Sequence, residues 1–72
     1  MTIGQSIREA RKSKGLTQRK LEVEAGVSQG ALSNWEKDIY SPSIFNLICL
    51  ADVLSVSLDE LVGRTPPKGG VG

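Results

Sequence analysis

The sequence of 72 residues contains no histidine and a single cysteine, Cys49. One cysteine cannot form a disulfide within the chain, and without histidine it cannot complete the ligand set of a zinc site. A lone thiol also lacks the neighbouring base that would activate it as a nucleophile. A phosphate-binding loop of the type G-x-x-x-x-G-K is absent as well. We therefore expect no metal, no cofactor, no small-molecule ligand and no enzymatic activity.

Long hydrophobic runs are missing too. No segment approaches the roughly 20 consecutive apolar residues of a membrane span. The opening residues, MTIGQSIREARK, lack the apolar core of a secretory signal. Together with the single cysteine, these features indicate a cytoplasmic protein with no membrane partner. Only one Trp, one Tyr and one Phe are present, and a chain of this length forms at most one domain with a small core.

The net charge of +1 hides an uneven distribution along the chain. Residues 8–20 carry six basic residues against one acidic residue, whereas residues 38–62 carry four acidic residues and no basic one. This polarity predicts that a polyanion would prefer the N-terminal half. The charges alone fit a basic, solvated first helix equally well.

Apolar residues at helical spacing predict five short helices and no strand. The first covers about residues 3–14, and the second covers residues 18–25 behind an N-cap at Thr17. Ser28 is expected to cap a third helix over about residues 29–37. The residues predicted to face the core from this part of the chain are Ile3, Ile7, Ala10, Leu21, Ala25, Val27, Ala31, Leu32 and Trp35.

A fourth helix is predicted after Pro42, and a fifth begins at the sequence SLDE. There the Ser57 hydroxyl and the Glu60 carboxylate can each bond the backbone of the other, as a capping box. The ending RTPPKGGVG is rich in proline and glycine. We predict an all-α domain over residues 1–63, a compact five-helix bundle, and a flexible tail or linker over residues 64–72. The expected inner stripe of the fourth helix is Ile44, Leu47, Ile48, Ala51 and Leu54.

Only the loop GVS, residues 26–28, separates the second and third predicted helices. A turn this short makes the two helices cross steeply and leaves one face of the third projecting from the body. That face is polar but uncharged, with Gln29, Gly30, Ser33 and Asn34. Glutamine and asparagine each present a donor and an acceptor in one plane, which matches the edge of adenine in the major groove. The pattern predicts a helix-turn-helix that reads DNA sequence.

In order and spacing, the segments GLTQ, AGVS, WE, PS, LA and VSLDEL resemble the Cro/repressor type of helix-turn-helix domain, also called lambda-repressor-like. The resemblance covers about residues 3–63. It implies a transcriptional regulator, most often a repressor, whose partner is double-stranded DNA. One recognition helix reads only a few base pairs, so a homodimer is expected at least on DNA, at a pseudo-palindromic site.

The resemblance also implies roles for individual residues. Gln18, at the start of the second helix, would contact a phosphate with help from the helix dipole, beside Arg19. The first residues of the third helix would read bases, and the loop after it would touch the DNA backbone. The residues expected at the DNA are Gln18, Arg19, Ser28, Gln29, Gly30, Ser33, Asn34, Lys37 and Tyr40.

A partly buried ion pair between Arg11 and Glu36 is a further implication of the resemblance. The chain departs from the family pattern at Glu22, where alanine is usual. We expect either a shifted helix crossing or a Glu22 side chain that extends outward. Asp38 and Ser55 stand where glycine is common, so left-handed backbone is expected at both positions.

Phe45 and Cys49 lie on the side of the fourth predicted helix opposite its expected inner stripe, and Ile39 is near in sequence. One interpretation is an exposed apolar patch for self-association or for a protein partner. The other is that residues 38–41 fold over Phe45 and bury it.

A second function class also fits the fold. The protein could be an interaction module, or an antitoxin-like partner of another protein, that keeps the helix-turn-helix without binding DNA. The uncharged polar face of the third helix favours DNA reading, because an interaction module has no reason to keep that face free of charge.

Overall fold

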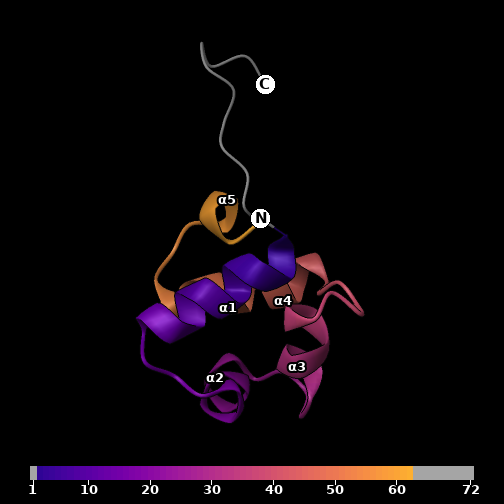
Figure 1. The fold of residues 1–72 in the computed structure, drawn as a ribbon. Helices are drawn as coiled ribbons and strands as arrows, with labels where there is room; N and C mark the ends of the chain where they lie inside the picture. The colour runs from indigo at the N-terminus through magenta and orange to yellow at the C-terminus, as the bar shows by residue number, and fades with distance from the viewer. Residues whose placement is uncertain (1, 63–72) are drawn as a thin grey trace.

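The structure, a computed structural model, describes residues 2–62. This part of the chain forms five helices and no strand, which confirms the all-α prediction: α1 (Ile3–Ser13), α2 (Gln18–Ala25), α3 (Ala31–Glu36), α4 (Ile44–Leu54) and α5 (Leu58–Leu61). Figure 1 shows α1 crossing the middle of the molecule in front of α4, with α2 below, α3 to one side and α5 above. The predicted tail, residues 64–72, lies outside the described residues. Within residues 2–62, no helix has the length and apolar character needed to cross a membrane.

The helix starts are fixed by local side chains. Thr17 accepts a hydrogen bond from the backbone N–H of Lys20, and Ser57 forms the capping box with Glu60, so both predicted caps are confirmed. Thr2 forms a second capping box at the start of α1, and Ser43 caps α4. Each such cap is worth about 1 kcal/mol of stability.

Left-handed backbone occurs at the two predicted non-glycine positions, with φ of 60° at Asp38 and 58° at Ser55. Asp38 follows α3, and its carboxylate accepts hydrogen bonds from the Thr2 hydroxyl at 2.8 Å and from the backbone N–H of Gly4 at 3.2 Å. A residue placed in a glycine-like conformation thereby connects the end of α3 to the start of α1.

Gly4 lets α1 and α3 approach closely. A Cβ atom at this position would lie less than 3.0 Å from the backbone carbonyl oxygens of Trp35 and Glu36. Both of those obstacles are main chain, so they cannot rotate away as a flexible side chain would. The absence of a side chain at Gly4 is therefore a condition of this packing.

The core lies between all five helices and includes Trp35, as predicted. Its buried apolar members are Ile7, Leu21, Leu32, Trp35, Leu47, Leu50, Ala51, Leu54 and Leu61. Partly buried residues around this set include Ile3, Ala10, Ala25, Val27 and Ala31.

The predicted inner face of α4 is partly wrong. Ile44 and Ile48 are exposed, whereas Leu50, which was not expected inside, is fully buried. The segment IFNLICL is apolar on every side of a helix, so spacing does not choose a face, and packing against α2 and α5 decides it. Phe45 has 76% of its surface exposed, so the alternative in which a loop covers it is also wrong.

Candidate nucleic-acid interface

The helix that faces outward, α3, starts later than the sequence predicts. It begins at Ala31 rather than residue 29, and its N-cap is Gly30, with φ of 85° and no side-chain cap. Ser28 is therefore not an N-cap, although its backbone carbonyl accepts from the N–H of Ala31 at 3.1 Å. Gln29 and Gly30 lie exposed in the turn before the helix. Glycine adopts this left-handed conformation without the steric cost that a Cβ would bring.

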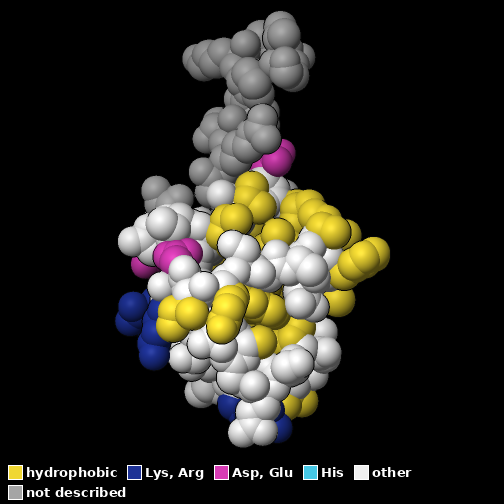
Figure 2. Space-filling model, turned by 90° about the vertical axis from the view of Figure 1, so that its right-hand side faces the viewer, with side chains coloured by type: hydrophobic (Ala, Val, Ile, Leu, Met, Phe, Trp, Pro, Cys, Tyr) yellow, Lys and Arg dark blue, Asp and Glu magenta, His cyan; other side chains and the backbone are white. Residues whose placement is uncertain are grey.

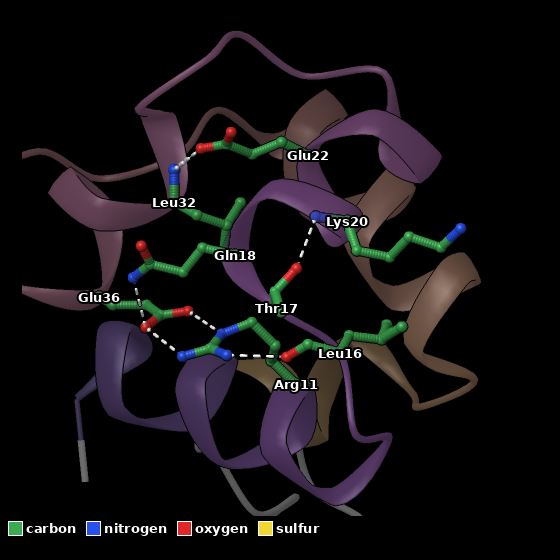
Figure 3. A network of polar contacts seen from close by, with 8 residues as sticks. All are labelled: Arg11, Leu16, Thr17, Gln18, Lys20, Glu22, Leu32 and Glu36. Carbon is green, nitrogen blue, oxygen red and sulfur yellow. Dashed lines mark hydrogen bonds and ion pairs between the residues drawn. The ribbon is translucent and has the colours of Figure 1, made fainter.

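Glu22 of α2 takes the place of the missing cap. Its side chain is 4% exposed, and Oε2 accepts hydrogen bonds from the backbone N–H of Gly30 at 2.9 Å and of Leu32 at 3.2 Å. Figure 3 shows this carboxylate pointing from α2 toward the start of α3. The prediction of an outward Glu22 is wrong because free N–H groups and the positive end of a helix stabilise a carboxylate there. Glu22 thus fixes the start of α3 against α2.

A second polar cluster holds the other end of α3. Arg11 Nε lies 2.7 Å from Glu36 Oε2, and Nη2 donates to Oε1 at 3.1 Å. Arg11 Nη1 also donates to the carbonyl of Leu16 at 2.8 Å, and Gln18 Nε2 donates to Glu36 Oε1 at 3.1 Å. The hydrogen bond to Glu36 raises the pKa of the Arg11 guanidinium above its ordinary value. Figure 3 shows side chains of α1, α2 and α3 meeting at this one carboxylate.

These contacts hold α3 at both ends and give the carboxylates beside it partners. Glu22 is bonded to backbone N–H groups, and Glu36 is paired with Arg11. Glu24, the remaining carboxylate of the two helices, lies 3.3 Å from Lys20 Nζ. Every acidic side chain of α2 and α3 therefore has a partner, which lowers the repulsion that an approaching polyanion would meet.

The residues predicted at the DNA form two groups by exposure. Ser33 and Asn34 are half-buried on α3, and Gln18 is half-buried with its amide donating to Glu36. The others are exposed: Arg19, Ser28, Gln29, Gly30, Lys37 and Tyr40. Arg19 lies 3.6 Å from Glu22 Oε1 with 62% of its side chain exposed, so this loose pair leaves the guanidinium accessible.

Sequence reasoning missed the inward role of Glu22 and the contact of Asp38 with the start of α1. A signal for Glu22 was present, because Gly30 has no side chain with which to cap the helix that follows it. The backbone N–H groups of the turn therefore required an acceptor from elsewhere, and the carboxylate of Glu22 was available on the preceding helix.

Comparison with known proteins places this geometry in a family. The Helix-turn-helix family profile matches residues 7–61. The immunity repressor protein of Bacillus phage phi105 is 38% identical over 64 residues, which are 89% of this chain and 44% of that protein. The chain thus spans less than half the length of that relative.

Two solved structures with DNA are also similar. The P22 c2 repressor in complex with a synthetic operator has a TM-score of 0.83 and 34% identity, over 90% of this chain and 98% of that one. SinR, a master regulator for biofilm formation, in complex with DNA has a TM-score of 0.79 and 39% identity, over 83% and 97% of the two chains. With a family match over most of its length and a fold shared with these two DNA-bound proteins, the chain belongs to the lambda-repressor-like helix-turn-helix family.

Proposed function

We propose that the protein is a sequence-specific DNA-binding transcriptional regulator, a repressor, that places α3 in the major groove of its operator. The observation that carries this proposal is the start of α3, where uncharged polar residues of the preceding turn and of a helix held at both ends reach the surface. A recognition element must be rigid, because misplacing its donors and acceptors would lose the discrimination between bases. The likeness to the P22 c2 repressor and to the regulator SinR, both solved with DNA, supports the same use of this surface.

Base reading falls to the turn before α3 and to its first two turns. Gln29 and Asn34 have the amide groups that can bond adenine N6 and N7 together, and Ser28 and Ser33 can donate or accept. Gly30 has open space where a side chain would stand, so its role is to let the backbone approach the DNA closely.

DNA phosphates on both sides of α3 are bound by residues of α2 and of the loop after α3. Gln18 lies at the start of α2, where the first backbone N–H groups have no partner inside the helix and favour an anion. Arg19 can turn from Glu22 to a phosphate at little cost, since an exposed pair at this distance contributes little stability. Lys37 and Tyr40 are exposed beyond the end of α3 and contact the backbone there.

Two copies bind one operator. Two recognition helices about 34 Å apart reach successive turns of the major groove on one side of the duplex, and the site is then pseudo-palindromic. Such a protein works in the cytoplasm, where its DNA is.

Selection of bound duplexes from a random pool tests the proposal. We expect enrichment of a pseudo-palindrome whose half-sites are centred about ten base pairs apart. A pool that stays random after repeated selection would contradict DNA reading by this protein.

A further inference from the structure

A pocket opens between α1 and the segment that connects α4 to α5. Its volume is about 450 Å³, and small-molecule sites in proteins usually occupy about 300–1,000 Å³. Figure 1 shows this connection passing beside the second half of α1, toward the opposite end of that helix from α3. The two walls come from segments that are distant along the chain, so no single stretch of the sequence has the pattern of a ligand site.

Ser6, on the α1 wall, gives the pocket an unsatisfied polar group. The residue is 5% exposed, and its hydroxyl has no hydrogen-bond partner within residues 2–62. Its backbone N–H is paired in the ordinary way, with the carbonyl of Thr2 at 2.9 Å, so only the side chain lacks a partner. Buried hydroxyls in proteins are nearly always paired, because an unpaired one loses its bonds to water without replacing them. The Ser6 hydroxyl therefore has no packing role that explains it.

Two carboxylates determine the charge of the pocket. Glu9 on α1 and Glu60 on α5 line it, and Lys14 is the basic residue beside them. None of these three residues is in an ion pair with another residue of the described range. Hydrogen bonds from Ser57 hold the pKa of Glu60 below its ordinary value, so this carboxylate is ionised at neutral pH. Two negative charges against one positive charge favour a cation over an anion.

We propose that this pocket binds a small organic cation, a primary ammonium group on an apolar body. An ammonium group has three hydrogens to donate, and the pocket offers three kinds of acceptor, the carboxylates of Glu9 and Glu60 and the hydroxyl of Ser6. The half-buried side chains of Ala10 and Val56 line the same pocket and supply an apolar wall. An inorganic cation would leave that wall in contact with water, whereas an apolar body covers it.

The pocket is separate from the surfaces described above, and the inference does not depend on the proposed function. None of the residues expected at the DNA lines it. Figure 2 shows a different face, where hydrophobic side chains gather at the surface and charged ones lie at the margins. The large exposed hydrophobic residues of the described chain are not part of the pocket either. A bound cation therefore leaves both the recognition surface and the exposed hydrophobic residues uncovered.

An NMR titration of the isotope-labelled full chain with phenylethylammonium tests the proposal. We expect saturable shifts at the backbone amides of Ala10, Leu54 and Val56, with a dissociation constant of roughly millimolar size for so small a ligand. Phenylethanol, which has the same body without the charge, should bind about tenfold more weakly, and the anion phenylpropanoate should not saturate. Glu9→Gln should weaken phenylethylammonium about threefold, whereas Glu24→Gln, on α2 outside the pocket, should leave its affinity unchanged.

Ser6→Ala gives the sharpest test, because the account predicts effects of opposite sign. Removing an unpaired buried hydroxyl should raise the melting temperature of the ligand-free protein by about 4 °C. The same change should weaken phenylethylammonium about threefold, because the ammonium loses an acceptor. Ser13→Ala, at the exposed end of the same helix, controls for the helix propensity of alanine and should raise the melting temperature less.

Three results would each overturn the inference. They are the absence of saturable shifts at the pocket, saturation by phenylethanol at the same concentration as phenylethylammonium, and a Ser6→Ala protein that melts below the parent. The last would mean that the hydroxyl stabilises the fold. None of these results bears on the proposed function, which is tested with DNA alone.

Discussion

Single residues determine where α3 begins, and Glu22 is the most informative of them. Its carboxylate accepts hydrogen bonds from two backbone N–H groups at the start of α3. A buried carboxylate without partners would be strongly destabilising, but this one is fully used. The side chain thereby connects α2 to the start of α3.

Replacing Glu22 tests this role. Glu22→Ala should lower the free energy of unfolding by about 1–3 kcal/mol, because the backbone N–H groups of Gly30 and Leu32, the second of them buried, lose their acceptor. Glu22→Gln should cost less, since the amide oxygen can still accept both bonds. Urea denaturation measures the difference, with Glu24→Gln on the exposed side of the same helix as control. If the alanine and glutamine variants are equally stable, the hydrogen bonds do not hold the start of α3.

The pair of Arg11 and Glu36 makes a second prediction for single residues. Arg11→Met or Glu36→Leu should each cost about 3 kcal/mol, because each leaves the other charge largely buried without its partner. The double variant should lose clearly less than the sum of the two. Thermal melts of the four proteins complete a double-mutant cycle, and strictly additive losses would show that the two groups are not coupled.

At the scale of whole helices, the close contact of α1 with α3 depends on Gly4. Gly4→Ala should destabilise the domain by about 1–3 kcal/mol, because the added methyl group meets backbone carbonyl oxygens that cannot move aside. The expectation runs against helix propensity, which favours alanine by about 1 kcal/mol. Ser13→Ala, at the exposed end of the same helix, is the control and should be neutral or stabilising. A stabilised Gly4→Ala protein would mean that the two helices can separate freely.

The cap of α5 predicts a pH dependence. Hydrogen bonds from the backbone N–H and the hydroxyl of Ser57 lower the pKa of Glu60 below its ordinary value of 4.5. The ionised form is favoured in the folded protein, so this stabilisation is complete above the ordinary value and is lost as pH falls through the lowered pKa. Titration of the Glu60 carboxyl by NMR should show the lower midpoint, and Ser57→Ala should raise it. A midpoint at or above 4.5 in the parent would contradict the capping box.

At the scale of the molecule, the sequence predicts the features that residues a few positions apart determine. It misses the features that contacts between different helices determine. Thr17 and Ser57 bond atoms three residues away, so their helix starts can be read locally. The start of α3 depends on Glu22, eight residues earlier and on another helix, so the local pattern misplaces it. Leu50 is buried in preference to Ile44 and Ile48 because the surrounding helices, not the spacing, select the face of α4.

In the candidate site, too, some features could be predicted from nearby residues and others depended on contacts between helices. The turn and its polar residues were visible in the sequence, and the resemblance to a family gave them roles at DNA. That Gln29 precedes α3, and that Gln18 shares Glu36 with Arg11, required the folded chain. The contacts of these residues with bases and phosphates remain predictions.

Fluorescence anisotropy with the selected duplex and a scrambled duplex, at several salt concentrations, gives the ratio of specific to non-specific affinity. Gln29→Ala and Asn34→Ala should each weaken binding to the selected duplex by about 1–3 kcal/mol and leave the scrambled duplex unaffected. Arg19→Ala should weaken both alike and make the salt dependence shallower, because it removes a phosphate contact. If neither Gln29→Ala nor Asn34→Ala changes the ratio, α3 does not read the operator and the account of this protein as a sequence-specific regulator is wrong.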